Sequence, residues 1–430
     1  MPQEDIGDQG KLHGPDAGAG RGTSGNGVPG VGNASASASP KADFKLESYL
    51  AKGVRDIVGE AVRLTLKDPR ESAFMARYAK ASKEATRRRE EAEKRGEHIP
   101  PFLIASITTS CNLHCAGCYA RYNMGCTGSA GEGEAGTAAD DVVAVDASLA
   151  GHARQLELSA SEWGDIFGEA RDLGIGFILL AGGEPLVRMD VMEEAGKVPQ
   201  ILFPVFTNGT LLDGERLDLF DRCRNLIPIF SIEGGQETTD LRRGAGTFER
   251  VSSSIDRVSG AGLIYGVSVT VTTENVDEVM GAGFLDSLAR SGCKVVFYVE
   301  YVPVDGDRPE LALSLADREV MLERAGELRE RYRDMLFLCF PGDERGSGGC
   351  LAAGRGFFHI NPHGGAEPCP FSPYSDMNVR DASLEAAISS PLFTSLREGG
   401  TLMEDHAGGC VLFEDRRHVE ELLQREQGGE

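Results

Sequence analysis

Six short apolar runs, each followed by an amphipathic stretch, constrain the fold of this 430-residue chain more than any other feature. Apolar runs of this length are typical of buried strands, and the amphipathic stretches between them are typical of helices. The expected strands are Phe102–Thr108, Phe177–Ala181, Ile201–Phe206, Leu226–Ile232, Gly266–Thr272 and Lys294–Tyr301. The expected helices cover about residues 159–173, 187–196, 211–223, 247–260, 276–291 and 315–333.

Repeated strand and helix units build a parallel sheet, because each right-handed crossover returns the chain to the same sheet. Six such units predict an α/β fold with an open, partial (β/α)6 barrel over residues 101–335. In barrels of this kind the chemistry lies at the C-terminal ends of the strands. The Gly-, Ala- and Asp-rich segment 126–157 interrupts the pattern and predicts a long loop insertion, either floppy or acting as a lid.

The segment before the barrel divides into a tail and a helical part. Residues 1–42 are rich in Gly, Ala, Ser and Pro and predict a disordered tail. Residues 43–100 predict N-terminal helices, since apolar residues from Leu50 to Val62 recur at helical spacing. Pro69 is expected to end the first helix, and Ser72 to begin a second that closes near Gly96.

Charge and composition exclude several classes of partner. The formal charge of −23 disfavours nucleic acid and anionic membranes as partners, since like charges repel. There is no apolar run of about 20 residues and no signal-peptide pattern, so we expect a cytoplasmic protein. In that compartment the ten cysteines are expected to serve metal binding or catalysis rather than disulfides.

Three of those cysteines follow the first expected strand directly. Cys111, Cys115 and Cys118 have the spacing C-x3-C-x2-C within the stretch TTSCNLHCAGCYA. Three thiolates can hold a [4Fe–4S] cluster and leave one iron open to another ligand, since such clusters normally take four. The alternatives are incidental cysteines or zinc, but structural zinc normally has four ligands.

This triplet, at the end of the first strand of a partial barrel, resembles the signature of the radical S-adenosylmethionine (SAM) superfamily. The resemblance covers roughly residues 102–305. It implies that SAM binds the open iron and is cleaved reductively to a 5′-deoxyadenosyl radical, which abstracts hydrogen from a substrate. The family usually has an aromatic residue before the third cysteine, where this chain has Gly117.

Further segments at expected strand ends resemble the SAM contacts of the same superfamily. Gly182, Gly183, Glu184 and Pro185 match its GGEP-type motif, which contacts the SAM amino group, although a plain turn is the alternative. The resemblance assigns SAM contacts also to Asn208 in the TNG segment, to Ser231 and Glu233 in SIEG, and to Arg243. Tyr298 and Glu300 share one face of the last strand, which points either into the barrel or away from it.

Cysteines near the C-terminus resemble a SPASM-type or twitch-like extension. Cys350 and Cys369 frame the pattern C-x13-G-x4-C through Gly364, and Cys410 follows. The resemblance implies an auxiliary [4Fe–4S] cluster in a domain over residues 336–430. A hairpin turning at residues 361–364 is expected to bring the first two cysteines together. The fourth ligand is open, with Cys339, a non-cysteine side chain or the substrate as candidates.

These features predict an anaerobic radical SAM enzyme supplied with electrons by a flavodoxin or ferredoxin. The resemblance favours a peptide or protein side chain as substrate, with a small molecule in cofactor biosynthesis as the alternative. A non-catalytic iron–sulfur protein for electron transfer or redox sensing is a second alternative, because the cysteines alone would suit it.

Overall fold

The computed structural model describes residues 69–124, 156–304, 306, 308–403 and 410–427. Its ten strands form one sheet in the order β10-β9-β8-β1-β2-β3-β4-β5-β6-β7. The strands are β1 (Phe102–Ser106), β2 (Phe177–Ala181), β3 (Phe203–Thr207), β4 (Leu226–Ser231), β5 (Gly266–Val271), β6 (Val295–Glu300), β7 (Leu336–Phe340), β8 (Phe357–Ile360), β9 (Gly365–Glu367) and β10 (Met377–Asn378).

The pairs from β8 through β1 to β7 are all parallel, and only β8–β9 and β9–β10 are antiparallel. The structure thus confirms the α/β class and the open, mostly parallel sheet. The six expected strands occur within about two residues of their predicted limits. The difference is that β7 and β8, which come after the predicted barrel, extend the parallel sheet at its two sides.

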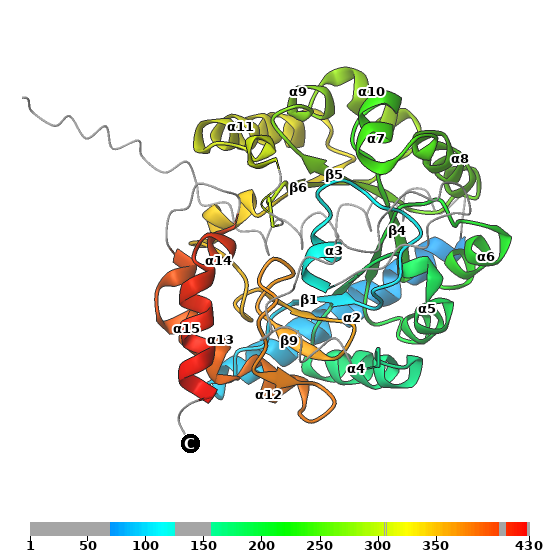
Figure 1. The fold of residues 1–430 in the computed structure, drawn as a ribbon. Coiled ribbons are helices and arrows are strands. Elements are labelled where there is room, and N and C mark those ends of the chain that lie inside the picture. Colours follow the sequence, from blue (N-terminus) through cyan, green and yellow to red (C-terminus); the bar gives the residue numbers. More distant parts are fainter. Residues whose placement is uncertain (1–68, 125–155, 305, 307, 404–409, 428–430) are drawn as a thin grey trace, which may run out of the picture. The chain divides into compact units, whose positions relative to one another are not determined.

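Helices connect the parallel strands and cover the outside of the sheet, as Figure 1 shows for α5, α6, α8 and α11. They are α2 (Pro69–Lys94), α3 (Tyr119–Met124), α4 (Ala160–Leu173), α5 (Met189–Gly196), α6 (Gly214–Arg222), α7 (Gln236–Arg243), α8 (Thr247–Gly260), α9 (Val276–Val279), α10 (Ala282–Arg290), α11 (Leu315–Arg331), α12 (Leu384–Ile388), α13 (Pro391–Glu398), α14 (Val411–Glu414) and α15 (Arg416–Gln427). Four 3-10 helices are η1 (Pro185–Val187), η2 (Pro309–Leu311), η3 (Gly342–Ser347) and η4 (Thr401–Met403).

Local sequence explains several helix limits. Ser159 and Glu162 form a reciprocal capping box at the start of α4, and Gly174 ends it with φ 94°. The single helix expected over 276–291 is two helices, because the chain turns at Gly281, where a Cβ would lie 2.9 Å from the Asp277 carbonyl oxygen.

Within the described residues α2 runs from Pro69, three residues before the expected start at Ser72. The expected helix over residues 50–62 and the tail 1–42 lie outside the described residues.

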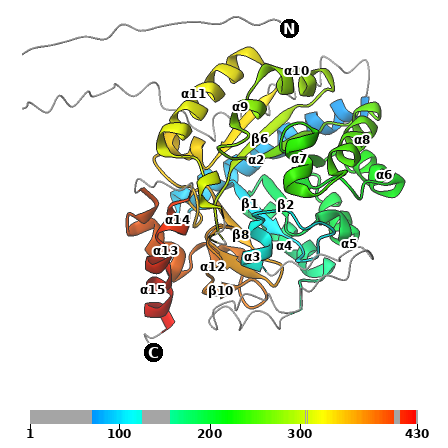
Figure 2. The ribbon, with the colours of Figure 1, turned by 45° about the horizontal axis from the view of Figure 1, so that its top comes forward.

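Helix α2 packs beneath the N-terminal ends of β3 and β4. Phe74, Met75 and Tyr78 of this helix are buried against Leu202 and Ile227 in a hydrophobic cluster of their own. Figure 2 shows α2 behind the sheet, with the short helix α3 in front of it. The loops that follow the strands therefore gather at the end of the barrel opposite α2.

Candidate radical SAM site

The three cysteines of the triplet line one cavity of about 360 Å³ inside the barrel. The loop that carries them begins after β1 and ends at α3. Burial, with smaller contributions from Glu184, Cys115 and Cys118 nearby, raises the pKa of the Cys111 thiol to about 11. The structure therefore places the three thiols in the wall of one cavity.

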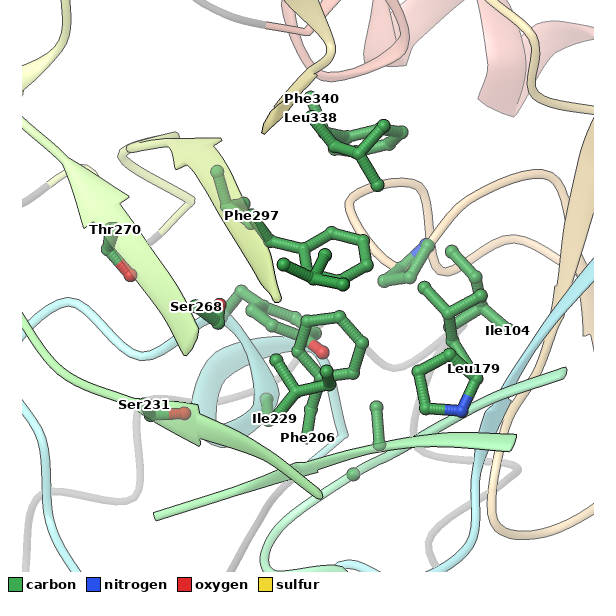
Figure 3. Close-up of a pocket in the computed structure, with 18 of the residues that line it drawn as sticks. Ile104, Leu179, Phe206, Ile229, Ser231, Ser268, Thr270, Phe297, Leu338 and Phe340 are labelled. Carbon is green, nitrogen blue, oxygen red and sulfur yellow. The ribbon is translucent and has the colours of Figure 1, made fainter. Parts of the chain in front are cut away.

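The wall of this cavity is mostly hydrocarbon. Side chains from six strands converge on its interior (Figure 3), namely Ile104, Leu179, Phe206, Ile229, Phe297, Leu338 and Phe340. Three hydroxyl residues, Ser231, Ser268 and Thr270, line it on β4 and β5. The cavity thus offers an apolar space with one polar side, below the cysteine loop.

The GGEP segment holds the cysteine loop by its backbone. The N–H groups of Gly183 and Glu184 donate to the carbonyl oxygens of Thr108 and Ser110, both at 2.8 Å. Gly182 has φ 127°, and a Cβ there would lie 2.5 Å from the Thr108 carbonyl oxygen. Glycine is needed at this position because the two backbones approach so closely.

The Glu184 side chain is fully buried, and its hydrogen bonds are made to other residues of the protein. Its carboxylate accepts hydrogen bonds from the N–H of Leu186 (3.0 Å), the Thr207 hydroxyl (2.7 Å) and the N–H of Asn208 (2.7 Å). Burial raises the pKa of Glu184, and these hydrogen bonds oppose the shift. Glu184 thus ties the end of β3 to the end of β2.

Asn208 connects the TNG segment to the cysteine loop, so this segment is more than a turn. Its side-chain amide donates to Asn112 Oδ1 (2.9 Å), and Asn112 Nδ2 donates to the Thr210 hydroxyl (2.8 Å). The sequence did not single out Glu157, whose carboxylate accepts from the N–H (2.7 Å) and hydroxyl (2.8 Å) of Thr109. Glu157 closes the predicted insertion, whose residues 126–155 lie outside the described part of the chain.

Glu233 and Arg243 form an ion pair beside the cysteine loop. Glu233 Oε1 accepts from Arg242 Nη1 (2.6 Å) and Arg243 Nε (2.8 Å), and Glu233 Oε2 accepts from the N–H of Thr270 (2.8 Å). Burial would raise the pKa of Glu233, but the two guanidinium groups hold it below its usual value. The charges predicted to contact SAM are thus paired with each other.

Tyr301 occupies the space beside Gly117. A Cβ at Gly117 would lie 2.6 Å from Cε2 of the Tyr301 ring, and Gly117 has φ 61°. An aromatic ring therefore stands beside the third cysteine, although it comes from the end of β6. Tyr298 points away from the cavity, since its hydroxyl donates to the Val279 carbonyl oxygen at 2.8 Å. Glu300 lines the cavity and pairs with Arg318 at 2.6 Å.

Cys350, Cys369 and Cys410 lie close together in the C-terminal part. The expected hairpin forms between β8 and β9, with His359 opposite Glu367. Burial raises the pKa of Cys369, which hydrogen-bonds with Cys410 and lies near Cys350. Cys339 is surrounded instead by Asp343, Arg329 and Glu300.

Two histidines of the hairpin, His359 and His363, are non-cysteine side chains near Cys369 in the sequence. His359 is fully buried, with its ring nitrogens 2.7 Å from Glu367 Oε2 and 2.8 Å from the Ser106 hydroxyl. Both nitrogens are therefore engaged. His363 lies in the hairpin turn, and its Nδ1 is buried without a hydrogen-bond partner.

Within the described ranges, no three His, Cys, Asp or Glu side chains converge as ligands of one metal ion. An iron–sulfur cubane has a different requirement, because each thiolate binds a separate iron. The chemistry of the donors fits such a cluster, since three thiols of one loop line one cavity and each is at least partly exposed. None of the described helices combines the length and apolarity needed to cross a membrane.

Residues 105–282 match the family described as Radical SAM superfamily. The chain contains a radical SAM domain. It is 26% identical over 347 residues to the AdoMet-dependent heme synthase of Methanosarcina barkeri, covering 74% of this chain and 89% of that protein. It is also 26% identical over 344 residues to the mycofactocin maturase MftC of Mycobacterium ulcerans, covering 73% and 80%.

The radical SAM fold is also seen in SuiB of Streptococcus suis bound to S-adenosylmethionine. That structure aligns with a TM-score of 0.55 at 15% identity and covers 72% of this chain and 70% of SuiB. Other relatives match over a shorter length, such as the Fe-coproporphyrin III synthase of M. barkeri, 39% of which is covered. The radical SAM domain is therefore common to relatives whose names differ in substrate.

Proposed function

We propose that this chain binds a [4Fe–4S] cluster on Cys111, Cys115 and Cys118 and uses it to modify a peptide or protein side chain. When bound, the cluster supplies one electron that cleaves SAM to methionine and a 5′-deoxyadenosyl radical, which abstracts hydrogen from the substrate. The observation that carries the proposal is the meeting of three cysteine thiols with an apolar cavity of about 360 Å³.

The protein's own residues position the cofactors and exclude water. Glu157, Glu184 and Asn208 fix the cysteine loop against the ends of β2 and β3 by the hydrogen bonds described above. We assign the SAM amino group to the carbonyl oxygens around Gly182 and Gly183, because a cationic ammonium needs acceptors. The Ser231 hydroxyl, which lines the cavity, is a candidate donor to SAM oxygens. The apolar wall keeps water away from a reactive radical.

The cavity wall supports an uncharged substrate group. Three of its charged lining residues are held in ion pairs: Arg243 with Glu233, Glu300 with Arg318 at 2.6 Å, and Asp343 with Arg329 at 2.6 Å. A peptide side chain satisfies this requirement, and SuiB has been crystallised with its precursor peptide SuiA. A small molecule in cofactor biosynthesis is the second candidate, because the chain covers 89% of the heme synthase.

The first experiment tests SAM cleavage. The protein is reconstituted anaerobically, reduced with dithionite and given SAM, and 5′-deoxyadenosine is measured. We expect product from the natural chain and from Cys223→Ala, whose thiol lies at the end of α6. Cys115→Ala should give none. An intact cluster without product would favour the electron-transfer alternative, and an active Cys115→Ala would remove this residue from the ligand set.

We propose further that Cys350, Cys369 and Cys410 bind an auxiliary cluster in a twitch-like domain over residues 336–430. These three cysteines lie close to one another, which supports this proposal. Cys339 lies instead beside Asp343, Arg329 and Glu300, which favours a fourth ligand other than Cys339. Glu344 is a candidate because its buried carboxyl lies beside Cys350 and its Oε1 has no hydrogen-bond partner. The triple variant of Cys111, Cys115 and Cys118 to Ala should retain about four irons. Zero iron would refute the auxiliary cluster.

The electron donor and the cellular location follow from the same proposal. A low-potential protein such as a flavodoxin or ferredoxin would reduce the cluster, and replacing dithionite with either should sustain product formation. The described cysteines are all free thiols, which supports a reducing cytoplasm. An inactive mixture with both donors, alongside activity with dithionite, would contradict the assignment of the donor.

A further inference from the structure

The last turn of α7 contacts the cysteine loop at two points. The N–H of Ala116 donates to the Arg242 carbonyl oxygen at 2.9 Å. Arg243 Nη1 lies 3.9 Å from Cys115 Sγ, within the range of a hydrogen bond to sulfur. Ala116 lies between Cys115 and Cys118 in the sequence, so α7 is hydrogen-bonded to the loop between the second and third cysteines. A guanidinium group is thereby held against a cysteine expected to bind iron.

A single buried carboxylate orients both arginines. Glu233 is 1% exposed and forms ion pairs with Arg242 at 2.6 Å and Arg243 at 2.5 Å. Its other oxygen accepts from the N–H of Thr270 on β5. Two cations thus face one carboxylate, and one positive charge is left in excess beside the cysteines. Both arginine side chains are themselves largely buried, at 18% and 10% exposure, so water screens this charge weakly.

Charges in this position act on the redox equilibrium of an iron–sulfur cluster. Reduction adds one negative charge to the cluster, so a neighbouring cation favours the reduced state and a neighbouring carboxylate favours the oxidised state. Hydrogen bonds to the cluster's sulfurs act in the same direction as the cation. The three side chains therefore oppose one another, with Glu233 moderating the arginines.

We propose that Glu233, Arg242 and Arg243 form a charge cluster that sets the reduction potential of the iron–sulfur cluster on Cys111, Cys115 and Cys118. This inference rests on the proposed function, because it requires a cluster at these cysteines. It assigns Arg243 to the cysteine loop, since its Nε and Nη2 contact Glu233 and its Nη1 faces Cys115. Glu233 and Arg242 are positioning residues that act through Arg243 and the loop backbone.

The test is a potentiometric titration of the reconstituted enzyme without SAM, followed by electron paramagnetic resonance of the reduced cluster. Arg243→Gln removes a cation and should make reduction at least tenfold less favourable, a shift of about 59 mV to more negative potential for one electron. Glu233→Gln removes the moderating carboxylate and should shift the potential to a more positive value. The double variant should lie between the two single variants.

Two controls separate this role from a structural one. Arg380→Gln removes an ion pair with Glu162 away from the cysteines and should leave the potential unchanged. Arg243→Lys keeps the charge and should shift the potential less than Arg243→Gln. This comparison still tests the proposal if Glu233→Gln fails to fold. Opposite shifts in the two neutral variants support the proposal, because a loosened loop would move both in one direction.

Shifts of the same sign, or none, overturn the proposal while leaving the proposed function intact. A natural chain that binds no cluster would instead refute the proposed function itself. A role of Arg243 in binding the SAM carboxylate would appear as weaker SAM binding with an unchanged potential, and this result would also overturn the proposal.

Discussion

The buried polar contacts of His359 allow a stability prediction with a magnitude. His359 links the Ser106 hydroxyl at the end of β1 to Glu367 on β9, and Asn361 Nδ2 donates to the other Glu367 oxygen at 2.6 Å. All four residues are less than 10% exposed. This chain of hydrogen bonds joins the strand that leads to the cysteine loop with the hairpin that leads to Cys369.

Replacing His359 with Leu leaves two buried groups without their partner. Removing one partner of a buried carboxylate costs about 3–5 kcal/mol, and leaving a buried hydroxyl unsatisfied costs about 1–3 kcal/mol. The two costs do not add in full, because both arise at one site whose side chains can rearrange. We therefore expect the free energy of unfolding to fall by about 4 kcal/mol. In His359→Leu/Glu367→Leu no buried carboxylate remains, so the double variant should lose less than His359→Leu alone.

Urea unfolding followed by tryptophan fluorescence measures this loss. Trp163 is the only tryptophan of the chain, is fully buried on α4, and packs against Phe167, so its emission reports the core. His98→Leu is the matched control, since His98 is a half-exposed histidine paired with Glu93, and its loss should cost under about 1 kcal/mol. A loss below about 1 kcal/mol in His359→Leu, or a double variant equal to the sum of the single ones, would refute the reasoning.

Three further predictions follow from the contacts described above. Gly117→Phe should weaken SAM binding in equilibrium dialysis, because the new side chain would overlap Tyr301. Adding Tyr301→Ala should restore part of the affinity. Unchanged SAM affinity in Gly117→Phe would contradict the contact. The pKa of Glu162 is lowered to about 2 by Arg380 and Ser159. Its ionised carboxylate should therefore stabilise the protein above pH of about 4.5, and this stabilisation should be lost as the pH falls toward 2. In Glu162→Gln, the free energy of unfolding measured in urea should therefore fall less steeply on the acid side of the pH profile. Glu157→Gln should reduce cluster occupancy in an iron assay by loosening Thr109, whereas Glu215→Gln on the exposed side of α6 should not.

The lengths and spacing of the apolar runs in the sequence were sufficient to predict the barrel and the position of its loops. Short apolar runs such as FILLA between Gly176 and Gly182 have one plausible structure, and the loops that follow parallel strands must meet at one edge. The GGEP and TNG segments therefore lie beside the cysteine loop. Their hydrogen bonds could not be predicted, because each depends on the relative height of neighbouring strands.

The errors have physical causes as well. Strand β8 pairs with β1, a partner about 250 residues away in the chain, and no local pattern indicates so distant a pairing. Glu157 and Tyr301 are isolated residues without a motif, and their roles arise only from their contacts with the loop that follows β1. The sequence assigns Arg243 to SAM because a guanidinium suits a carboxylate; the pairing of Arg243 with Glu233 could not be predicted, since no local pattern indicates it.

The position of α2 has a consequence for the order of events during turnover. Met75 and Tyr78 line the cavity from the side of α2, and the three cysteines line it from the loop after β1, so one cavity has to hold both the cofactor and the substrate. A molecule that binds last stands in the way of one that bound earlier, so the spent fragments of one cycle must depart before the next can begin.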